Sequence, residues 1–484
     1  MLNVPLLILL HALVVIVYSA RIIYRRLPTS TSTAWILVIA ALPILGLFFY
    51  IFFGDQKLSR RRARLGRKVN AFYQEMFDIA DRDEDLKRIE PDSLYAKIAP
   101  LISQDTGFYP SRGNRIEHLT DVSDISRAML NDIEQAERSC HMEFFIIRPY
   151  GLIADILNAV LDAAARGVDC RILADDIGSS DFFKSDWIQT LRDGGVKVER
   201  SLKTGFIRSL SERADLRNHR KLMVIDQDVA YTGSFNLIDP SYQGADADTR
   251  NWVDVILRLE GNIVLSLACV FNKDYLLDSQ NAADEFVSLQ DLPLDERDST
   301  QTDAMLQLIP SGPEMQHSLI YEVLLAAFFN AKQSIYIVTP YFVPDEALIL
   351  AVTNAARRGL DVTLILPSSI DSHLARYAGQ SEFGKLLRSG VNITLFREGM
   401  LHTKAVIIDG ELGFIGTVNM DQRSFYLNLE VTLAIADNEF LNAFSTVIKD
   451  YLEQSDRLDK ERWAQRSPGT RLLENLCRLV GPML

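Results

Sequence analysis

The sequence predicts an α/β protein with two repeated lobes behind two transmembrane helices. Each lobe is expected to be a mixed β-sheet flanked by helices, and the two lobes to be related by a pseudo-two-fold axis. Three observations lead to this fold class: two uncharged apolar runs open the chain, one order of strands and helices occurs twice, and a short charged motif is repeated. Repeated strand and helix units bury a sheet between helical layers. The 484 residues, 48% of them apolar, are enough for cores of this size.

The first expected elements are membrane helices at residues 1–20 and 34–53. Neither run contains a charged residue, and about twenty apolar residues cross a bilayer as a helix. A cleaved signal peptide is the alternative for the first run, but that run lacks a basic start and the second run follows closely. His11 is expected to be a tolerated polar residue, although an ionisable group in a membrane is always a candidate site. Residues 1–56 are therefore expected to form a two-helix membrane anchor.

The basic residues around the second run predict the orientation of the chain. Seven lysines and arginines lie at residues 57–68, against three at residues 21–26 between the runs. Because the basic side of a membrane segment faces the cytoplasm, we expect the N-terminus and the large C-terminal part inside the cell. The same basic segment also suits contact with anionic headgroups, or serves as a topology signal alone.

Charge and cysteine content limit the partners of the chain. The net charge is -13, with 51 Lys+Arg against 64 Asp+Glu, which argues against nucleic acid as the main partner. The four cysteines, at positions 140, 170, 269 and 477, have no metal-ligand spacing. They are expected to be reduced thiols of a cytosolic domain, with no structural zinc.

The remaining elements follow in order along the chain. Residues 57–118 are expected to be a basic juxtamembrane segment and a helical linker, and residues 119–300 the first lobe. Hydrophobic periodicity in that lobe predicts a helix at 125–137, a strand at 142–147, a helix at 152–166 and a strand at 168–173. Gly167 is placed to cap the second helix.

The second lobe, residues 301–484, repeats this order. Its helices are expected at 321–331 and 346–358, and its strands at 335–338 and 360–366. The helix-to-strand junctions of the two lobes align, 165–169 with 357–361 and 194–198 with 389–393. The polar stretch 279–302 is expected to connect the lobes.

Each lobe carries one copy of a motif that reads His, any residue, Lys, four apolar residues, Asp. In both copies, a Gly-Ser or Gly-Thr pair and an Asn follow, with the Asn seventeen positions after the His. The first copy comprises His219, Lys221, Asp226, Ser234 and Asn236, and the second His402, Lys404, Asp409, Thr417 and Asn419. The duplication predicts one site made of two halves. Two histidines, two lysines and two asparagines at one point would suit a phosphodiester.

The apolar residues after each lysine predict that the motif lies on a buried strand. Side chains alternate along a strand, so His219 and Lys221 are expected on one face, as are His402 and Lys404. Asp226 and Asp409 then fall on the opposite face and are expected to fix the motif from behind, without touching the substrate. We take the His, Lys and Asp of both copies as the catalytic set.

Two further acids are predicted to orient the histidines. A histidine nucleophile needs a carboxylate or carbonyl on its other ring nitrogen. Asp254 and Glu430 each open a matching apolar strand, and we assign them this role.

Structural explanations compete with these assignments. A single His in a strand is usually a core residue, and the Ser, Thr and Asn positions after each strand are typical of turns. Their matching offsets make us interpret Ser234, Asn236, Thr417 and Asn419 as phosphate donors instead. Metal ligation by the histidines is disfavoured, because a lysine lies two residues away and no acidic cluster accompanies it.

The doubled motif with its Gly-Ser-x-Asn or Gly-Thr-x-Asn segment resembles the phospholipase D superfamily. With two N-terminal spans, the whole chain is similar to bacterial cardiolipin synthases. Segments at 230–240, 339–344 and 401–404 also read like that family. The resemblance implies a multi-pass protein of the bacterial inner membrane, with cytoplasmic catalytic lobes and no cofactor or metal.

The reaction implied by the resemblance is a two-step phosphatidyl transfer between two phosphatidylglycerol molecules, giving cardiolipin and glycerol. By this analogy His219 is the nucleophile that forms a phosphohistidine, and His402 is the acid and base. The expected partners are phosphatidylglycerol and the bilayer, and not nucleic acid. Hydrolysis to phosphatidic acid and a phosphatidylethanolamine donor fit the same residues, and a tethered nuclease or a scaffold are less favoured alternatives. Residues 463–484 are interpreted either as an interfacial amphipathic helix or as a helix packed on the lobe.

Overall fold

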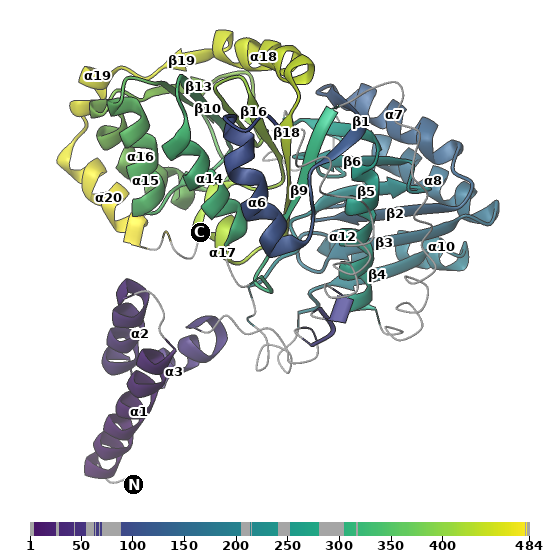
Figure 1. The fold of residues 1–484 in the computed structure, drawn as a ribbon. Coiled ribbons are helices and arrows are strands. Elements are labelled where there is room, and N and C mark those ends of the chain that lie inside the picture. Colours follow the sequence, from purple (N-terminus) through teal and green to yellow (C-terminus); the bar gives the residue numbers. More distant parts are fainter. Residues whose placement is uncertain are drawn as a thin grey trace. The chain divides into compact units, whose positions relative to one another are not determined.

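The computed structural model describes residues 4–25, 29–42, 44–54, 62, 64–66, 68–69, 89–204, 213, 215–240, 252–279, 304–315, 318–479 and 481 (Figure 1). The chain divides into two units, residues 1–63 with 203–216, and residues 64–202 with 217–484. The first unit contains the N-terminal helices, and the second contains both copies of the motif. Most of the basic segment at 57–68, much of the linker and the connector at 280–302 lie outside the described residues.

The first unit begins with α1 (Val4–Tyr24), followed by α2 (Thr29–Ala41), α3 (Leu45–Phe49) and the π-helical turn η1 (Tyr50–Gly54). Among the described residues one helix, Pro5–Tyr24, is long and apolar enough to cross a membrane. The expectation of one membrane helix at residues 34–53 was wrong, because α2 ends at Ala41 and Ile44 has a left-handed φ of 67°. The helices meet around Ile22, Ile39 and Tyr50.

A single mixed sheet runs through the described part of the second unit. Its fifteen strands lie in the order β19-β13-β12-β10-β15-β16-β18-β9-β1-β8-β6-β5-β2-β3-β4. The strands of the first half are β1 (Ser111–Leu119), β2 (Ser139–Phe144), β3 (Asp169–Asp175), β4 (Lys197–Ser201), β5 (Lys221–Ile225), β6 (Val229–Gly233) and β8 (Ile256–Gly261). Those of the second half are β9 (Ala304–Ser311), β10 (Ser334–Val338), β12 (Asp361–Pro367), β13 (Asn392–Phe396), β15 (Ala405–Ile408), β16 (Leu412–Gly416), β18 (Glu430–Ala436) and β19 (Ser455–Arg457).

The two halves have the same strand order, read outward from the antiparallel pair β1 and β9. In each half a parallel set, β2-β3-β4 or β10-β12-β13, continues into antiparallel strands toward the centre, and the second half adds β19 as an antiparallel edge strand outside β13. The mixed sheet of each half is therefore confirmed. Part of the expected helical linker belongs to this sheet, because Ser111–Leu119 forms β1 and pairs with both β8 and β9.

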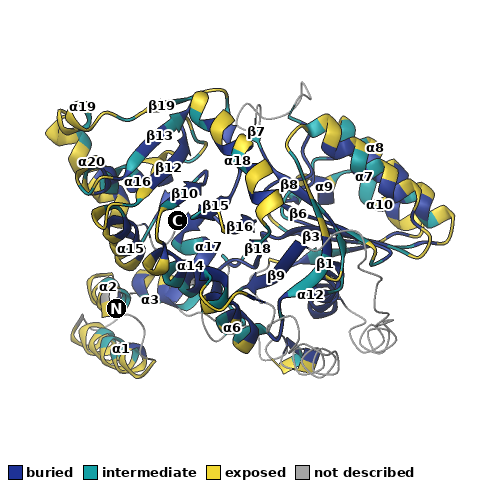
Figure 2. Ribbon diagram, turned by 45° about the horizontal axis from the view of Figure 1, so that its top comes forward, coloured by how far each residue is buried: buried dark blue, intermediate teal, exposed yellow. Residues whose placement is uncertain are grey.

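Helices cover both faces of the sheet, and the strands between them are buried (Figure 2). In the first half, α7 (Val122–Glu134), α8 (Leu152–Ala165), α9 (Ser180–Lys184) and α10 (Trp187–Asp193) pack on one face and α12 (Ile263–Asp278) on the other. In the second half, α6 (Leu94–Thr106), α14 (Leu319–Asn330), α15 (Glu346–Arg357) and α16 (His373–Arg388) cover one face and α18 (Asn438–Glu453) the other. The remaining helices are α17 (Gln422–Tyr426), α19 (Lys460–Ala464) and α20 (Pro468–Leu479). One hydrophobic cluster includes α12, α18 and strands of both halves, so a common core joins them.

The repeated helix ends follow from glycines at equivalent positions. Gly167 (φ 96°) and Gly359 (φ 93°) follow α8 and α15 in the left-handed region, where glycine has no steric penalty. The next backbone N–H bonds back to the helix, from Val168 to Ala163 O at 3.1 Å and from Leu360 to Ala355 O at 3.3 Å. This hydrogen-bond pattern is a Schellman cap, and it turns each chain directly into a parallel strand.

Candidate active site

The two motif copies lie where the halves of the sheet exchange backbone contacts. His219 precedes β5, and its N–H donates to Leu429 O at 2.9 Å, just before β18 of the other half. His402 follows β14 (Met400–Leu401), which pairs in parallel with β7 (Trp252–Val253) of the first half. Its N–H donates to Val253 O at 2.8 Å. Each histidine is thus placed by backbone of the opposite half.

The expectation that the whole His-x-Lys segment lies on a strand was wrong. β5 begins at Lys221 and β15 at Ala405, so both histidines stand in the connections that lead into these strands. The reason is that the histidine N–H groups bond to the other half of the molecule, not to neighbouring ladder strands.

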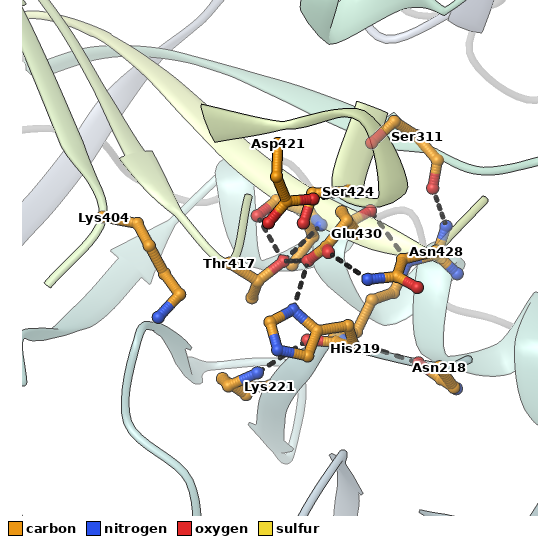
Figure 3. A network of polar contacts seen from close by, with 12 residues as sticks. Asn218, His219, Lys221, Ser311, Lys404, Thr417, Asp421, Ser424, Asn428 and Glu430 are labelled. Atoms are coloured by element: carbon orange, nitrogen blue, oxygen red, sulfur yellow. Dashed lines mark hydrogen bonds and ion pairs between the residues drawn. The ribbon is translucent and has the colours of Figure 1, made fainter. Parts of the chain in front are cut away.

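Each imidazole is held by the acid that the other half supplies. His219 Nδ1 lies 2.9 Å from Glu430 Oε2, and His402 Nδ1 lies 2.6 Å from Asp254 Oδ1. All four side chains are buried or nearly so. Figure 3 shows His219 directly beneath Glu430, with Thr417 and Asn428 beside the carboxylate. With Nδ1 engaged in this way, Nε2 of each ring is left for the reacting group.

The hydroxyl groups of Ser234 and Thr417 contact these acids. Ser234 Oγ donates to Asp254 Oδ1 at 2.6 Å, and Thr417 Oγ1 donates to Glu430 Oε2. In this arrangement each hydroxyl hydrogen is used on a carboxylate, so neither is free for a phosphate oxygen, the role expected from the sequence. A hydroxyl bonded to a carboxylate favours the charged form of the acid.

The two asparagines of the motif differ in their contacts. Asn236 accepts a hydrogen bond from the Ile146 N–H at 3.3 Å through its side-chain oxygen. Asn419 is also buried, and its Oδ1 has no hydrogen-bond partner among the described residues. Because a buried amide oxygen without a partner is costly, Asn419 is a candidate for binding a ligand.

Both lysines of the motif are buried close to the histidines. Lys221 Nζ donates to His219 O at 2.8 Å, and Lys404 Nζ donates to His402 O at 2.7 Å. Burial lowers the pKa of Lys221 to about 8, against the raising effect of Glu430 and Asp254. Burial also holds the pKa of Lys404 well below its ordinary value, and the charge of Lys221 adds to this effect. Burial disfavours the charged form of both lysines, so an anion bound between them would restore their charge and be attracted by it.

Asp226 and Asp409 lie away from the histidines and bind backbone. Asp226 accepts hydrogen bonds from the N–H groups of residues 137, 138 and 139, at 2.6–2.8 Å. Asp409 does the same for residues 332, 333 and 334, at 2.7–2.9 Å. Each aspartate therefore ties the end of its motif strand to the start of the neighbouring strand, which agrees with a position behind the motif.

The ionisation of the four central groups is set by burial and by their mutual charges. Burial is the largest influence on both histidines and lowers the pKa of His219 to about 4 and that of His402 to about 3. Burial alone would raise the pKa of Glu430 and Asp254, but the partner histidine, through charge and hydrogen bond, and the neighbouring lysine lower both. At neutral pH these shifts favour neutral imidazoles and charged carboxylates.

The aromatic neighbours of the two histidines differ, and neither of them was predicted from the sequence. Trp252 stacks on His402 with ring centroids 4.2 Å apart and an interplanar angle of 27°. Phe145 meets His219 edge-on at 4.9 Å and 63°. The aromatic face beside His402 stabilises a cationic ring more than an edge contact does. The position of Trp252, two residues before Asp254, was the one feature of the sequence that could have indicated its place in the site.

Three more residues of the site were missed. Asn428 Nδ2 donates to Glu430 Oε1 at 3.1 Å, and Arg220 Nε donates to the Glu430 backbone oxygen at 3.0 Å. Asp421 lies in the same network (Figure 3), and burial raises its pKa to about 6. Arg220 occupies the variable position of the motif, where sequence gives no reason to single it out. Within the described ranges, no group of three His, Cys, Asp or Glu side chains has the arrangement of a metal site.

The doubled site and its α/β framework match one family of known proteins. The family model of the cardiolipin synthase phospholipase D-like domain matches residues 129–273 and 324–452, more than half of the chain. The chain belongs to the cardiolipin synthase family. The phospholipase D-nuclease N-terminal model also matches residues 12–54. Members of the family are phosphatidyltransferases, and the chain is an enzyme of this class.

Full-length relatives support the membership. The chain is 35% identical over 480 residues to cardiolipin synthase A of Escherichia fergusonii, which covers 99% of this chain and 98% of the relative. It is 32% identical over 481 residues to cardiolipin synthase A of Buchnera aphidicola, with 99% and 98% covered. The crystal structure of phosphatidylserine synthase from Haemophilus influenzae has a similar fold, with a TM-score of 0.58 at 14% identity, covering 76% of this chain and 95% of that one.

Proposed function

We propose that the site transfers a phosphatidyl group from one phosphatidylglycerol to another, giving cardiolipin and glycerol through a phosphohistidine. The observation that carries this proposal is the pair of crossed contacts, in which each histidine is bonded through Nδ1 to a buried acid. Two imidazoles with free Nε2 atoms can serve a nucleophilic step and a proton transfer on either side of one phosphorus.

In the first step, His219 Nε2 attacks the phosphorus of the donor lipid. The bond from phosphorus to the glycerol oxygen breaks, and His402 delivers its Nε2 proton to that oxygen as glycerol leaves. Glu430 stabilises the positive charge that develops on the His219 ring when its Nε2 becomes bonded to phosphorus. The lowered pKa of His219, about 4, keeps this ring neutral and able to attack.

In the second step, His402 acts as the base. Its Nε2 accepts the proton of a glycerol hydroxyl on the second phosphatidylglycerol while that oxygen attacks the phosphohistidine. The bond from phosphorus to His219 breaks, cardiolipin is released, and His402 again holds the proton for the next cycle. Atoms and charge balance without a cofactor or a metal.

Binding of the anionic substrate favours the protonated form of His402. Because burial lowers the pKa of His402 to about 3, its proton is scarce before binding. A phosphodiester anion next to the ring raises that pKa, and the stacked Trp252 also favours the cation, which supports His402 as the acid. Binding of the lipid is therefore coupled to uptake of a proton.

The phosphate oxygens are proposed to lie between Lys221, Lys404, Asn236 and Asn419. The unpartnered Oδ1 of Asn419 supports this, since a rotated amide would direct its NH₂ group to the anion. Ser234 and Thr417 act on the phosphate indirectly, through the acids to which they donate. Asp226 and Asp409 position the motif strands from behind.

We also propose the arrangement of the two lobes and of the membrane anchor. The equal strand order of residues 119–300 and 301–484 supports two lobes related by a pseudo-two-fold axis. α1 and the apolar helices at residues 29–54 support a two-span anchor at residues 1–56, joined by residues 57–118 to lobes on the cytoplasmic side of a bacterial inner membrane.

The test is turnover of labelled phosphatidylglycerol by the full chain in detergent with excess chelator, with cardiolipin, glycerol and phosphatidic acid resolved. Equal amounts of cardiolipin and glycerol are expected, and His219→Ala and His402→Ala should each abolish both. Phosphatidic acid as the sole lipid product would show a hydrolase, and turnover only with added metal would overturn the paired-histidine mechanism.

A further inference from the structure

The last described helix, α20 (Pro468–Leu479), presents leucines to the outside of the molecule. Leu472, Leu473, Leu476 and Leu479 are 61%, 43%, 53% and 76% exposed, whereas Glu474 and Cys477 are buried. Positions 472, 476 and 479 follow the spacing of one helical face, and position 473 borders it. Figure 2 shows the exposed side of α20 at the edge of the molecule.

The orientation of α20 is fixed by its inner face. Cys477 packs with Val343, Ala375 and Ala378, next to α16. Arg466 forms a bidentate contact with the buried Glu474, at 2.8 and 3.0 Å. A rotation of α20 about its axis that buried its leucines would break this ion pair and expose Cys477. The leucine face is therefore an outward surface of the folded protein.

The charges of α20 complement an anionic surface. Its charged residues are Arg471, Glu474 and Arg478, and the one acid is neutralised by Arg466 on the inner side. Arg471 and Arg478 are exposed beside the leucines, although Arg478 also contacts Glu382 at 2.9 Å. Leucines flanked by arginines are typical of helices that lie at the boundary between headgroups and acyl chains.

The same helix is linked to the active site by a short path. Val343, which Cys477 contacts, belongs to β11 (Phe342–Val343). β11 pairs in parallel with β17 (Met420–Asp421), which directly follows Asn419. A surface that positions α20 thus also positions the edge of the proposed phosphate site.

We propose that α20 is an interfacial helix whose leucine face enters the headgroup boundary of a bilayer containing anionic phospholipid. The membrane contact itself does not depend on the proposed function. Its consequence does rest on that function, because the contact would hold the active site at the level of the lipid headgroups. A second copy of the chain fits the leucine face less well than a bilayer does. Four leucines on one helix expose on the order of 400 Å², about half of what each partner buries in a standard interface.

The first experiment places a label on the helix in the full chain. Leu476→Cys, and as a matched control Leu350→Cys on α15, are labelled with an environment-sensitive fluorophore and reconstituted into vesicles of phosphatidylglycerol and phosphatidylcholine. Leu350 is 58% exposed and lies outside α20, and the four native cysteines are buried, so the unmodified chain gives the background. Lipids with a quencher on the acyl chain should quench the label at 476 at least threefold more than the label at 350. Equal quenching at both positions would overturn the proposal, as would energy transfer between labels on two chains without lipid quenching.

The second experiment separates this helix from the chemistry. A variant with Leu472, Leu473, Leu476 and Leu479 all changed to Gln should show an apparent KM for vesicle phosphatidylglycerol raised on the order of tenfold. Its turnover of short-chain, monomeric phosphatidylglycerol and its melting temperature should match those of Leu350→Gln. An unchanged vesicle KM would refute the role of α20. Absence of turnover of both the vesicle lipid and the short-chain lipid by the unmodified chain would instead refute the proposed function, and the quenching result would still stand.

Discussion

Replacing Glu430 with glutamine removes one negative charge from behind His219 while keeping the size of the side chain. Glu430 is fully buried, and its Oε2 lies 2.9 Å from His219 Nδ1. The amide oxygen of glutamine can take the position of Oε2 and accept from Thr417. Its NH₂ group then takes the position of Oε1, where Asn428 accepts through Oδ1 once its own amide is rotated. The change therefore tests the charge of the acid and not its packing.

The expected loss follows from the charge that forms on His219 during transfer. At roughly 4 Å between charge centres and an effective dielectric constant of about 20, a carboxylate stabilises a cationic ring by about 4 kcal/mol. Part of this remains through the amide oxygen, so we expect a loss of about 3–4 kcal/mol, which is roughly 10²–10³ in rate.

The assay is a single turnover with enzyme in excess over labelled phosphatidylglycerol. Glycerol release reports the first step, and quenching in alkali preserves a phosphohistidine. Glu430→Gln should slow glycerol release by the full factor, with less labelled protein at early times. Asp254→Asn, which affects His402, should slow glycerol release and cardiolipin formation together.

The control is Asn428→Ala, which removes one neutral hydrogen bond to the same carboxylate and should cost about 1 kcal/mol, or roughly fivefold in rate. Melting temperatures of all variants exclude unfolding as the cause. If Glu430→Gln releases glycerol within fivefold of the unmodified enzyme, the acid does not stabilise a charged His219 and our account of the first step is wrong.

Three other outcomes follow from the structure. Asp226→Ala and Asp409→Ala each remove an acceptor of three backbone N–H groups and should lower the free energy of unfolding by about 3 kcal/mol, measured by denaturant titration. Arg220→Met leaves Asp274 buried without its ionic partner and should cost about 3–5 kcal/mol, while Arg220→Met with Asp274→Leu should recover most of that loss. Since the pKa of His402 falls from 6.5 to about 3 on folding, the unfolded chain binds the extra proton. The free energy of unfolding should therefore fall as the pH is lowered from 6.5 toward 3. In a plot of melting temperature against pH, His402→Gln should show a smaller slope over this range.

Much of the fold was predictable because its signals are local. The glycine after α8 and α15 ends each helix through a left-handed backbone conformation that glycine adopts without penalty. Gly167 was expected as a cap, and the alignment of the two junctions placed Gly359 at the equivalent position. Periodicity likewise located these helices to within a residue at each end. The strand at β2 was placed three residues too late, since its start is fixed by Asp226, which lies far away in the sequence. β1 was missed because its partners, β8 and β9, are distant segments.

The site was predicted in composition more than in arrangement. The repeated motif identified both histidines and both lysines as residue types suited to phosphoryl chemistry, and the matching apolar strands identified Asp254 and Glu430 as the orienting acids. Which acid holds which histidine was not readable, because Glu430 lies 211 positions from His219 and Asp254 lies 148 from His402. Trp252 and Asn428 were missed for the same reason, since their roles exist only through the side chains they contact.

The sequence by itself determined that the chain repeats an α/β unit, that each unit carries one half of a charged motif, and that an apolar segment precedes them. These properties follow from spacing along the chain, which side-chain alternation and helix caps translate into local structure. The tertiary structure alone decided that the acids cross between halves, that Ser234 and Thr417 serve those acids, and that α20 turns its leucines outward. Hydrogen bonds and burial depend on distances in space, and residues more than a hundred positions apart acquire them only when the sheet brings both halves together.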